Sequence, residues 1–112
     1  MPGQADRPDL GSVAPSDRPI NGFQILEQVA KLPISTWRYR WEEPRVRHLG
    51  PMAQDWATTF GLGENDTTIA AVDANGVALV SIQALYHLLG ELRNEVVELR
   101  QQLRALTAKT NK

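Results

Sequence analysis

Two histidines and the absence of cysteine limit the chemistry that this chain can perform. The 112-residue sequence contains His48, His87 and no Cys, which excludes disulfides and thiolate metal sites. No carboxylate cluster stands at ligand spacing from either imidazole, so we expect no metal and no cofactor. His48 fits a structural residue that hydrogen-bonds backbone before a helix, and Gln54 fits a polar network.

A second segment with chemical potential alternates aromatic and basic residues over Trp37–Trp41. Such a row could stack the bases of single-stranded nucleic acid. Strict alternation over 34–41 also predicts a half-buried strand, with its aromatic side chains facing the core and its arginines facing solvent. The formal net charge of -1 favours the strand, because nucleic acids and anionic membranes attract strongly basic proteins. We therefore expect no nucleic acid and no membrane partner, and no apolar stretch is long enough to span a bilayer.

The first helix is predicted after a Pro-rich arm. Residues 1–20 hold four of the seven Pro and two Gly, which is typical of an extended linker. Asn21 fits an N-cap with Gln24 three residues later, a capping-box arrangement. The apolar spacing then extends to about Leu32, and Pro33 ends the helix.

A second helix is predicted from Gly50-Pro51 to Gly61. Pro is favoured at the first position of a helix, and Gly at the residue that ends one. Three large apolar residues four apart form one stripe between them: Met52, Trp56 and Phe60. The charged residues 42–49 ahead of this helix predict a turn and a short strand.

A β-hairpin is predicted after the second helix. Short β-type runs at about 69–72 and 77–80 flank Asp73-Ala74-Asn75-Gly76. Asn-Gly between apolar runs is a strong signal for a two-residue turn. Ser81 then fits the N-cap of a long terminal helix.

The last third of the chain is an unbroken heptad repeat. Every a and d position is apolar: Ile82, Leu85, Leu89, Leu92, Val96, Leu99, Leu103 and Leu106. This spacing is the seam of a coiled coil. A helix cannot bury so narrow a stripe on itself, so the sequence predicts association with copies of the chain or with a different coiled-coil protein.

The heptads permit two or three strands. Leu at every d position favours two, whereas Tyr86 and Leu88 beside the seam widen the apolar face, as three helices require. In a parallel arrangement Glu95 at g meets Arg100 at e of the neighbouring chain, an attractive pair worth only about a few tenths of a kcal/mol. No basic helix precedes the repeat, which argues against a leucine-zipper DNA-binding protein.

Three sequence elements in combination resemble one known family. They are Ser16-Asp17-Arg18 ahead of a short helix, the run 48–55 and the run 72–85 that leads into the heptads. Over about residues 16–106 the chain resembles the endosialidase-type C-terminal intramolecular chaperone domain of phage tail fibres and tailspikes. The resemblance implies structural roles for the motif residues His48, Gly50, Ala53, Gln54, Asp73 and Gly76.

The resemblance implies a homotrimeric module that holds three chains in register while an upstream fibrous region folds. The resemblance favours three helices over two in the coiled coil. It also implies that the partners are sister chains and a fibre or spike protein. The implied fold is α+β, with a helix/strand globular region containing a β-hairpin over 16–80 and a long helix over 81–107 in a parallel trimeric coiled coil. Residues 1–15 are then a flexible arm or linker, and 108–112 a tail.

Many members of the resembled family release themselves by self-cleavage. Their nucleophile is a Ser in a Ser-Asp context with a Lys five residues later as base; Ser16 matches the first position, and Asn21 occupies the second. An amide does not accept the hydroxyl proton, and the first Lys is Lys31. We therefore expect Ser16 to be a vestigial nucleophile. The alternative is an autoproteolytic serine protease that cleaves before Ser16, with Lys31 or His48 as the base.

The resemblance also implies a location. No charged-then-apolar signal peptide opens the sequence. A tail-fibre chaperone is expected in the phage virion, or in the cytoplasm during assembly.

Overall fold

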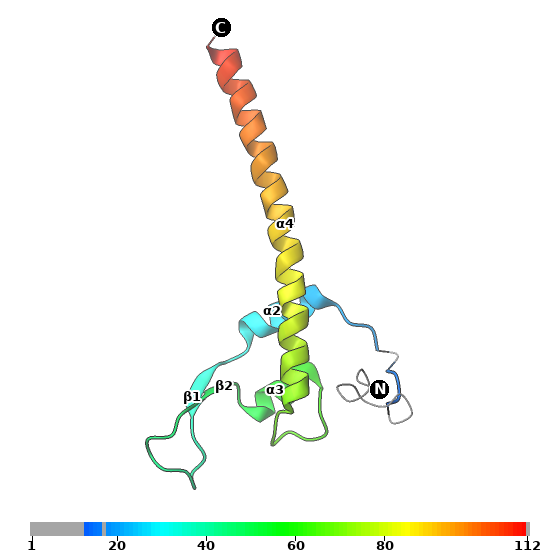
Figure 1. Cartoon of the computed structure of the whole chain (residues 1–112), viewed down its shortest axis with the longest axis vertical. Helices are drawn as coiled ribbons and strands as arrows, with labels where there is room; N and C mark the ends of the chain where they lie inside the picture. Colours follow the sequence, from blue (N-terminus) through cyan, green and yellow to red (C-terminus); the bar gives the residue numbers. More distant parts are fainter. Residues whose placement is uncertain (1–12, 17, 112) are drawn as a thin grey trace, which may run out of the picture.

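The described part of the chain, residues 13–16 and 18–111 of a computed structural model, consists of helices and one small hairpin (Figure 1). In chain order the elements are α2 (Gly22–Lys31), β1 (Ser35–Trp37), β2 (His48–Gly50), α3 (Ala53–Phe60) and α4 (Ala71–Thr110). The predicted α+β class, with a hairpin and a long C-terminal helix, is confirmed. Residues 1–12 of the predicted arm, Asp17 of the Ser-Asp element and Lys112 of the predicted tail lie outside the described residues.

Helix α2 begins and ends where local signals place it. The Asn21 side-chain oxygen accepts hydrogen bonds from the backbone N–H groups of Phe23 at 3.1 Å and Gln24 at 3.2 Å. These bonds satisfy two of the donors that the first turn of a helix leaves free. At the other end Leu32 turns extended and is buried, ahead of Pro33. The predicted cap and the predicted end are confirmed.

The observed hairpin joins β1 and β2, which pair antiparallel with Trp37 opposite His48. The strand predicted over 34–41 is too long, because β1 ends at Trp37. The Arg38 guanidinium donates to three backbone carbonyls of the following loop, those of Tyr39, Arg40 and Glu42. These bonds hold the chain in a loop where the alternation alone predicted extended backbone. The short strand predicted within 42–49 is confirmed as β2, at its C-terminal end.

The hairpin predicted over 69–80 is wrong, because those residues enter α4 at Ala71. Asn75 and Gly76 lie inside the helix, where together they disfavour helical structure by roughly 1.5 kcal/mol relative to Ala. Burial of Val77, which is 7% exposed, offsets this with about 1.5–3 kcal/mol. Ser81 is therefore not an N-cap; it is buried in the helix interior, and Ala70 precedes the first turn.

Helix α3 begins later than predicted and ends as predicted. Gly50 is the last residue of β2, paired with Ser35, and the helix starts only at Ala53. The opening predicted at Gly50-Pro51 is therefore wrong, since the ladder with β1 holds Gly50 in extended backbone. Gly61 ends the helix in the left-handed region, with φ 61°.

The core is small and lies where three helices meet. Leu32 at the end of α2, Trp56 of α3 and Val77 of α4 are its buried centre. Ile25, Val29, Phe60, Ile69 and Ala74 pack around them. No described side chain is less than 2% exposed, and a core of this size leaves a lone chain marginally stable. Beyond its crossing with α2, α4 extends away from every other element (Figure 1).

Candidate functional site

The predicted seam lies uncovered along α4. The helix has 40 residues, which at 1.5 Å per residue is roughly 60 Å. All eight seam side chains are exposed, from 38% for Val96 to 64% for Leu103. Removing such half-exposed aliphatic side chains from water is worth on the order of 1 kcal/mol each. The length and regularity of this stripe make it the candidate site of the molecule.

The charged side chains beside the seam are free of partners within the described chain. Glu95 and Arg100 are exposed, and the salt bridges found among residues 13–16 and 18–111 join Arg45 to Glu43 and His48 to Glu42. No salt bridge in this part of the molecule involves α4. The predicted pairing of Glu95 with Arg100 of a neighbour thus has both groups available, and it stays a prediction.

A second stripe on α4, which the sequence reasoning missed, contacts the chain's own α2. Val77, Ser81 and Ala84 are buried on this side. At Gly22 the two helices come so close that an added Cβ would lie 3.2 Å from the Val80 Cγ1 atom. The sequence signal for this stripe was the presence of small residues at three- and four-residue spacing. The hydroxyl of Ser81 is buried and has no hydrogen-bond partner among the described residues.

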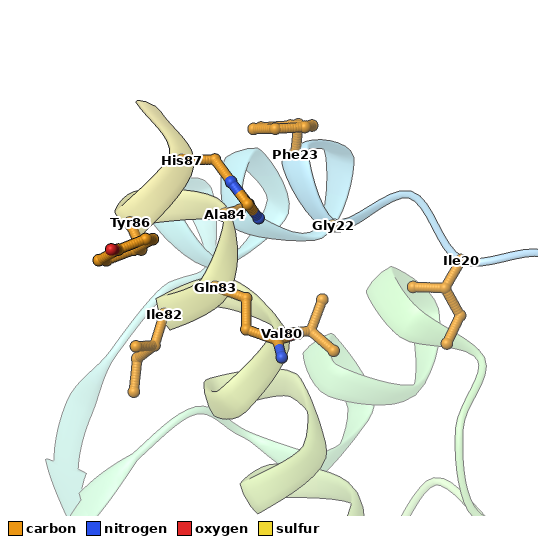
Figure 2. A pocket seen from close by; sticks show the side chains of 9 residues that line it. All are labelled: Ile20, Gly22, Phe23, Val80, Ile82, Gln83, Ala84, Tyr86 and His87. Atoms are coloured by element: carbon orange, nitrogen blue, oxygen red, sulfur yellow. The ribbon is translucent and has the colours of Figure 1, made fainter. Parts of the chain in front are cut away.

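An open apolar groove flanks the crossing of α2 and α4 (Figure 2). Ile20 and Phe23 line it from the α2 side, and Ile82, Tyr86 and His87 from α4. Ile82 and Tyr86 point to one side of α4, away from Gly22 and Ile20. Ile82, the a-position residue that starts the predicted seam, is 59% exposed.

The geometry around Ser16 resembles a turn more than a nucleophile site. Ser16 is exposed, and its Oγ accepts the backbone N–H of Arg18 at 3.3 Å. Ser16 and Asn21 line one groove, but the Asn21 amide caps α2. Lys31 lies at the opposite end of α2, about 13 Å along the axis, and His48 is bonded to Glu42. No described base hydrogen-bonds Ser16.

His48 bonds a side chain, so the prediction of a backbone partner is wrong. Its Nε2 lies 2.9 Å from both carboxylate oxygens of Glu42, and its ring lies 4.8 Å from that of Trp37. The pKa of Glu42 is lowered, first by the backbone N–H of Tyr39 and then by the hydrogen bond from His48. The contact closes the loop between β1 and β2. His87 is exposed on α4.

The aromatic row is only partly a core face. Trp37 and Tyr39 meet edge to face at 5.0 Å, and Tyr39 stacks on Trp41 at 4.5 Å. The predicted common side of these three rings is confirmed, but Trp41 is 81% exposed. The expectation that the whole row faces the core is wrong, since the loop carries its end away from the helices. Trp56 and Phe60 do pack in the core, while Met52 is exposed.

The remaining motif residues are distributed over three elements. Gly50 ends β2, and Ala53 and exposed Gln54 form the first turn of α3. Asp73 lies in the first turn of α4, where a carboxylate complements the positive end of the helix dipole, and Gly76 follows one turn later. Gln54 makes no side-chain hydrogen bond to a described residue.

Two site classes have no counterpart among the residues described. No group of three His, Cys, Asp or Glu side chains in this part of the chain is arranged to hold a metal ion. None of its helices is long and apolar enough to cross a membrane.

One comparison with known proteins gives a family. The family model described as chaperone of endosialidase matches residues 17–61, which cover α2, the hairpin and α3. No curated protein and no solved structure matches the chain. The family supports a chaperone role for a tail-fibre or tailspike protein. The match over residues 17–61 supports an endosialidase chaperone-type domain in this chain.

Proposed function

We propose that the chain is a homotrimerisation module that acts as an intramolecular chaperone for a tail-fibre or tailspike protein, without self-cleavage. The uncovered a/d stripe of α4 is the observation that carries the proposal. Eight half-exposed aliphatic side chains outnumber the four buried apolar residues of the described part of the chain: Leu32, Trp56, Val77 and Ala84. Association would therefore bury apolar surface that the described chain leaves in water.

In mechanism, three α4 helices associate in parallel through their a and d side chains. The globular parts, built on α2 and α3, then lie around one end of the bundle. The segments that precede Asn21 are held close together, which raises their effective concentration. Aligning three upstream chains thereby loses less entropy, and their β-rich region folds in register.

Two neighbouring valines give a matched test of association. Val96 occupies an a position, and Val97 occupies the outer b position and is 53% exposed. We expect Val96→Glu to dissociate the trimer, because it places three carboxylates in one buried layer. Val97→Glu should leave the trimer intact. Light scattering of both variants and of the parent chain at micromolar concentration measures the mass.

Each result of this test has a defined consequence. A parent chain with the mass of a folded monomer overturns the proposal. A stable complex formed only with another coiled-coil protein supports a scaffold instead. If both variants dissociate equally, or if neither does, association does not depend on the predicted seam.

The absence of self-cleavage is tested on the same protein. Ser16 has no described base at hydrogen-bond distance, so we expect the purified chain to keep its full mass. Intact-mass spectrometry after prolonged incubation measures this. A fragment that begins at Ser16 and disappears in Ser16→Ala would establish the protease alternative.

A further inference from the structure

Because α4 starts at Ala71, the heptad positions continue to residues that precede Ile82. The helix is uninterrupted through this region, so the a position seven residues before Ile82 is Asn75. The d position seven residues before Leu85 is Ala78. Asn75 and Ala78 are both exposed. The hairpin predicted at these residues would begin the seam only at Ile82. The observed helix extends the seam by one a position and one d position.

This extension lies on the side of α4 that α2 leaves free. The chain's own α2 covers the stripe of Val77, Ser81 and Ala84. Leu79, next to the extended seam at an e position, is 63% exposed. Figure 2 shows Ile82 pointing away from Gly22 at the crossing with α2. Two sets of side chains therefore share the first half of α4, one facing α2 and one facing outward.

We propose that Asn75 forms a hydrogen-bonded layer between sister chains that fixes their parallel, in-register alignment. The inference rests on the proposed association of identical chains. A side-chain amide carries both donor and acceptor groups, so identical Asn residues around a symmetry axis satisfy one another. A single polar a-position residue in an otherwise apolar seam is a known determinant of coiled-coil alignment.

The rest of the seam discriminates poorly between alignments. A slip of one heptad would place apolar residues against apolar residues almost everywhere, but it would place Asn75 against Ile82. An antiparallel arrangement would place it against the apolar far end of the helix. Either error leaves a buried amide without a partner, which is strongly unfavourable. Asn75 is thus the one a-position residue between Ala71 and Leu106 that penalises misalignment.

The charges beside the seam favour the same parallel orientation. Glu95 at g and Arg100 at e, both without an ion-pair partner among the described residues, meet between chains when neighbours run parallel and in register. This complementarity identifies copies of the same chain as the occupants of the surface. The amide layer and the charge pair both favour parallel chains, and only the amide layer opposes a slip of one heptad, because Arg93 occupies the e position seven residues before Arg100.

The absence of Cys permits a direct alignment test. Thr110 is the a-position residue four heptads after Ile82, so Thr110→Cys adds a unique thiol at the far end of α4. In a parallel, in-register trimer these thiols meet, and mild oxidation links chains in pairs. The test compares the thiol variant alone, with Asn75→Val, and with Asn94→Val, whose outer f position makes it a matched control.

We expect the thiol variant to cross-link efficiently and Asn94→Val to leave the yield unchanged. Asn75→Val should lower the yield roughly threefold or more and broaden the mass distribution in light scattering. Equal cross-linking and a single trimer mass in Asn75→Val overturn the inference. A trimer of the thiol variant that does not cross-link also overturns it, but leaves association standing, whereas a monomer refutes the proposed function itself.

Thermal melting gives a second readout that does not depend on the thiol. An amide in a buried layer lowers stability relative to an apolar residue, so Asn75→Val should melt at a higher temperature than the parent chain. Asn94→Val should change the melting temperature little. Equal small shifts in both variants place Asn75 in solvent and contradict the proposed layer.

Discussion

His48 Nε2 lies 2.9 Å from both carboxylate oxygens of Glu42, and this contact ties β2 to the loop that leads into it. Glu42 Oε1 also accepts the backbone N–H of Tyr39 at 2.8 Å. The carboxylate thus holds both ends of the loop between the strands. The backbone donor, and then the imidazole, lower the pKa of Glu42 below its ordinary value.

Acid should therefore weaken the hairpin through Glu42. A carboxyl whose pKa is depressed in the folded state contributes stability that is complete above its unfolded pKa, about 4.3, and is lost as the pH falls through the folded value. We expect Glu42→Gln to lower the melting temperature at about pH 7 and to equal the parent chain at about pH 2.

Melting curves of both proteins as a function of pH check this prediction, with Glu43→Gln as the control. Glu43 bonds Arg45 in solvent, with both side chains more than half exposed, so its replacement should have little effect at any pH. A Glu42→Gln difference that is the same at all pH values would contradict the assignment.

Replacing Gly76 distinguishes a helix from a hairpin at that position. Gly76 lies inside α4, and an added Cβ would meet no atom within 4 Å. Gly76→Ala should therefore raise the free energy of unfolding by about 0.5–1 kcal/mol. In an Asn-Gly hairpin turn the same change would destabilise, because that turn requires positive φ. Thermal or urea unfolding measures the sign, and Gly90→Ala on the outer face of α4 is the helical control.

Gly61 should respond in the opposite direction. Its φ of 61° is left-handed, and it ends α3 by donating its N–H to Ala57 at 2.9 Å. Gly61→Ala should lower the free energy of unfolding by about 1–2 kcal/mol, since an L side chain is strained there. Space is not the reason, because no atom lies within 4 Å of an added Cβ. An unchanged urea midpoint would show that the left-handed cap contributes nothing.

A charge exchange across the seam tests the predicted ion pair. Glu95→Arg should lower the melting temperature of the assembly, and adding Arg100→Glu should restore most of the loss. The coupling is about 0.2–1 kcal/mol per pair and should shrink at high salt. Glu98→Arg, at an outer c position, is the control and should not be rescued by Arg100→Glu. Additive effects of the two exchanges would mean that the residues do not meet.

Local signals in the sequence predicted several features correctly. Asn21 caps α2, Gly61 ends α3, and Pro33 follows the end of α2 as expected. Each depends on residues within one turn of each other, so tertiary contacts are not needed to specify it. The heptad repeat likewise defines which side of α4 is apolar, because helical periodicity alone fixes that side.

Only the tertiary structure decided where α4 begins and which strands pair. Asn75-Gly76 signals a turn locally, but burial of Val77 against Leu32 and Trp56 outweighs that preference. The sequence also did not predict that His48 bonds Glu42, because this contact depends on the loop that Arg38 and Glu42 close. The sequence by itself determined the ends of α2, the left-handed end of α3 and the apolar stripe. The fold decided between competing local structures, because burying one side chain in a shared core outweighs the weak preferences of a turn.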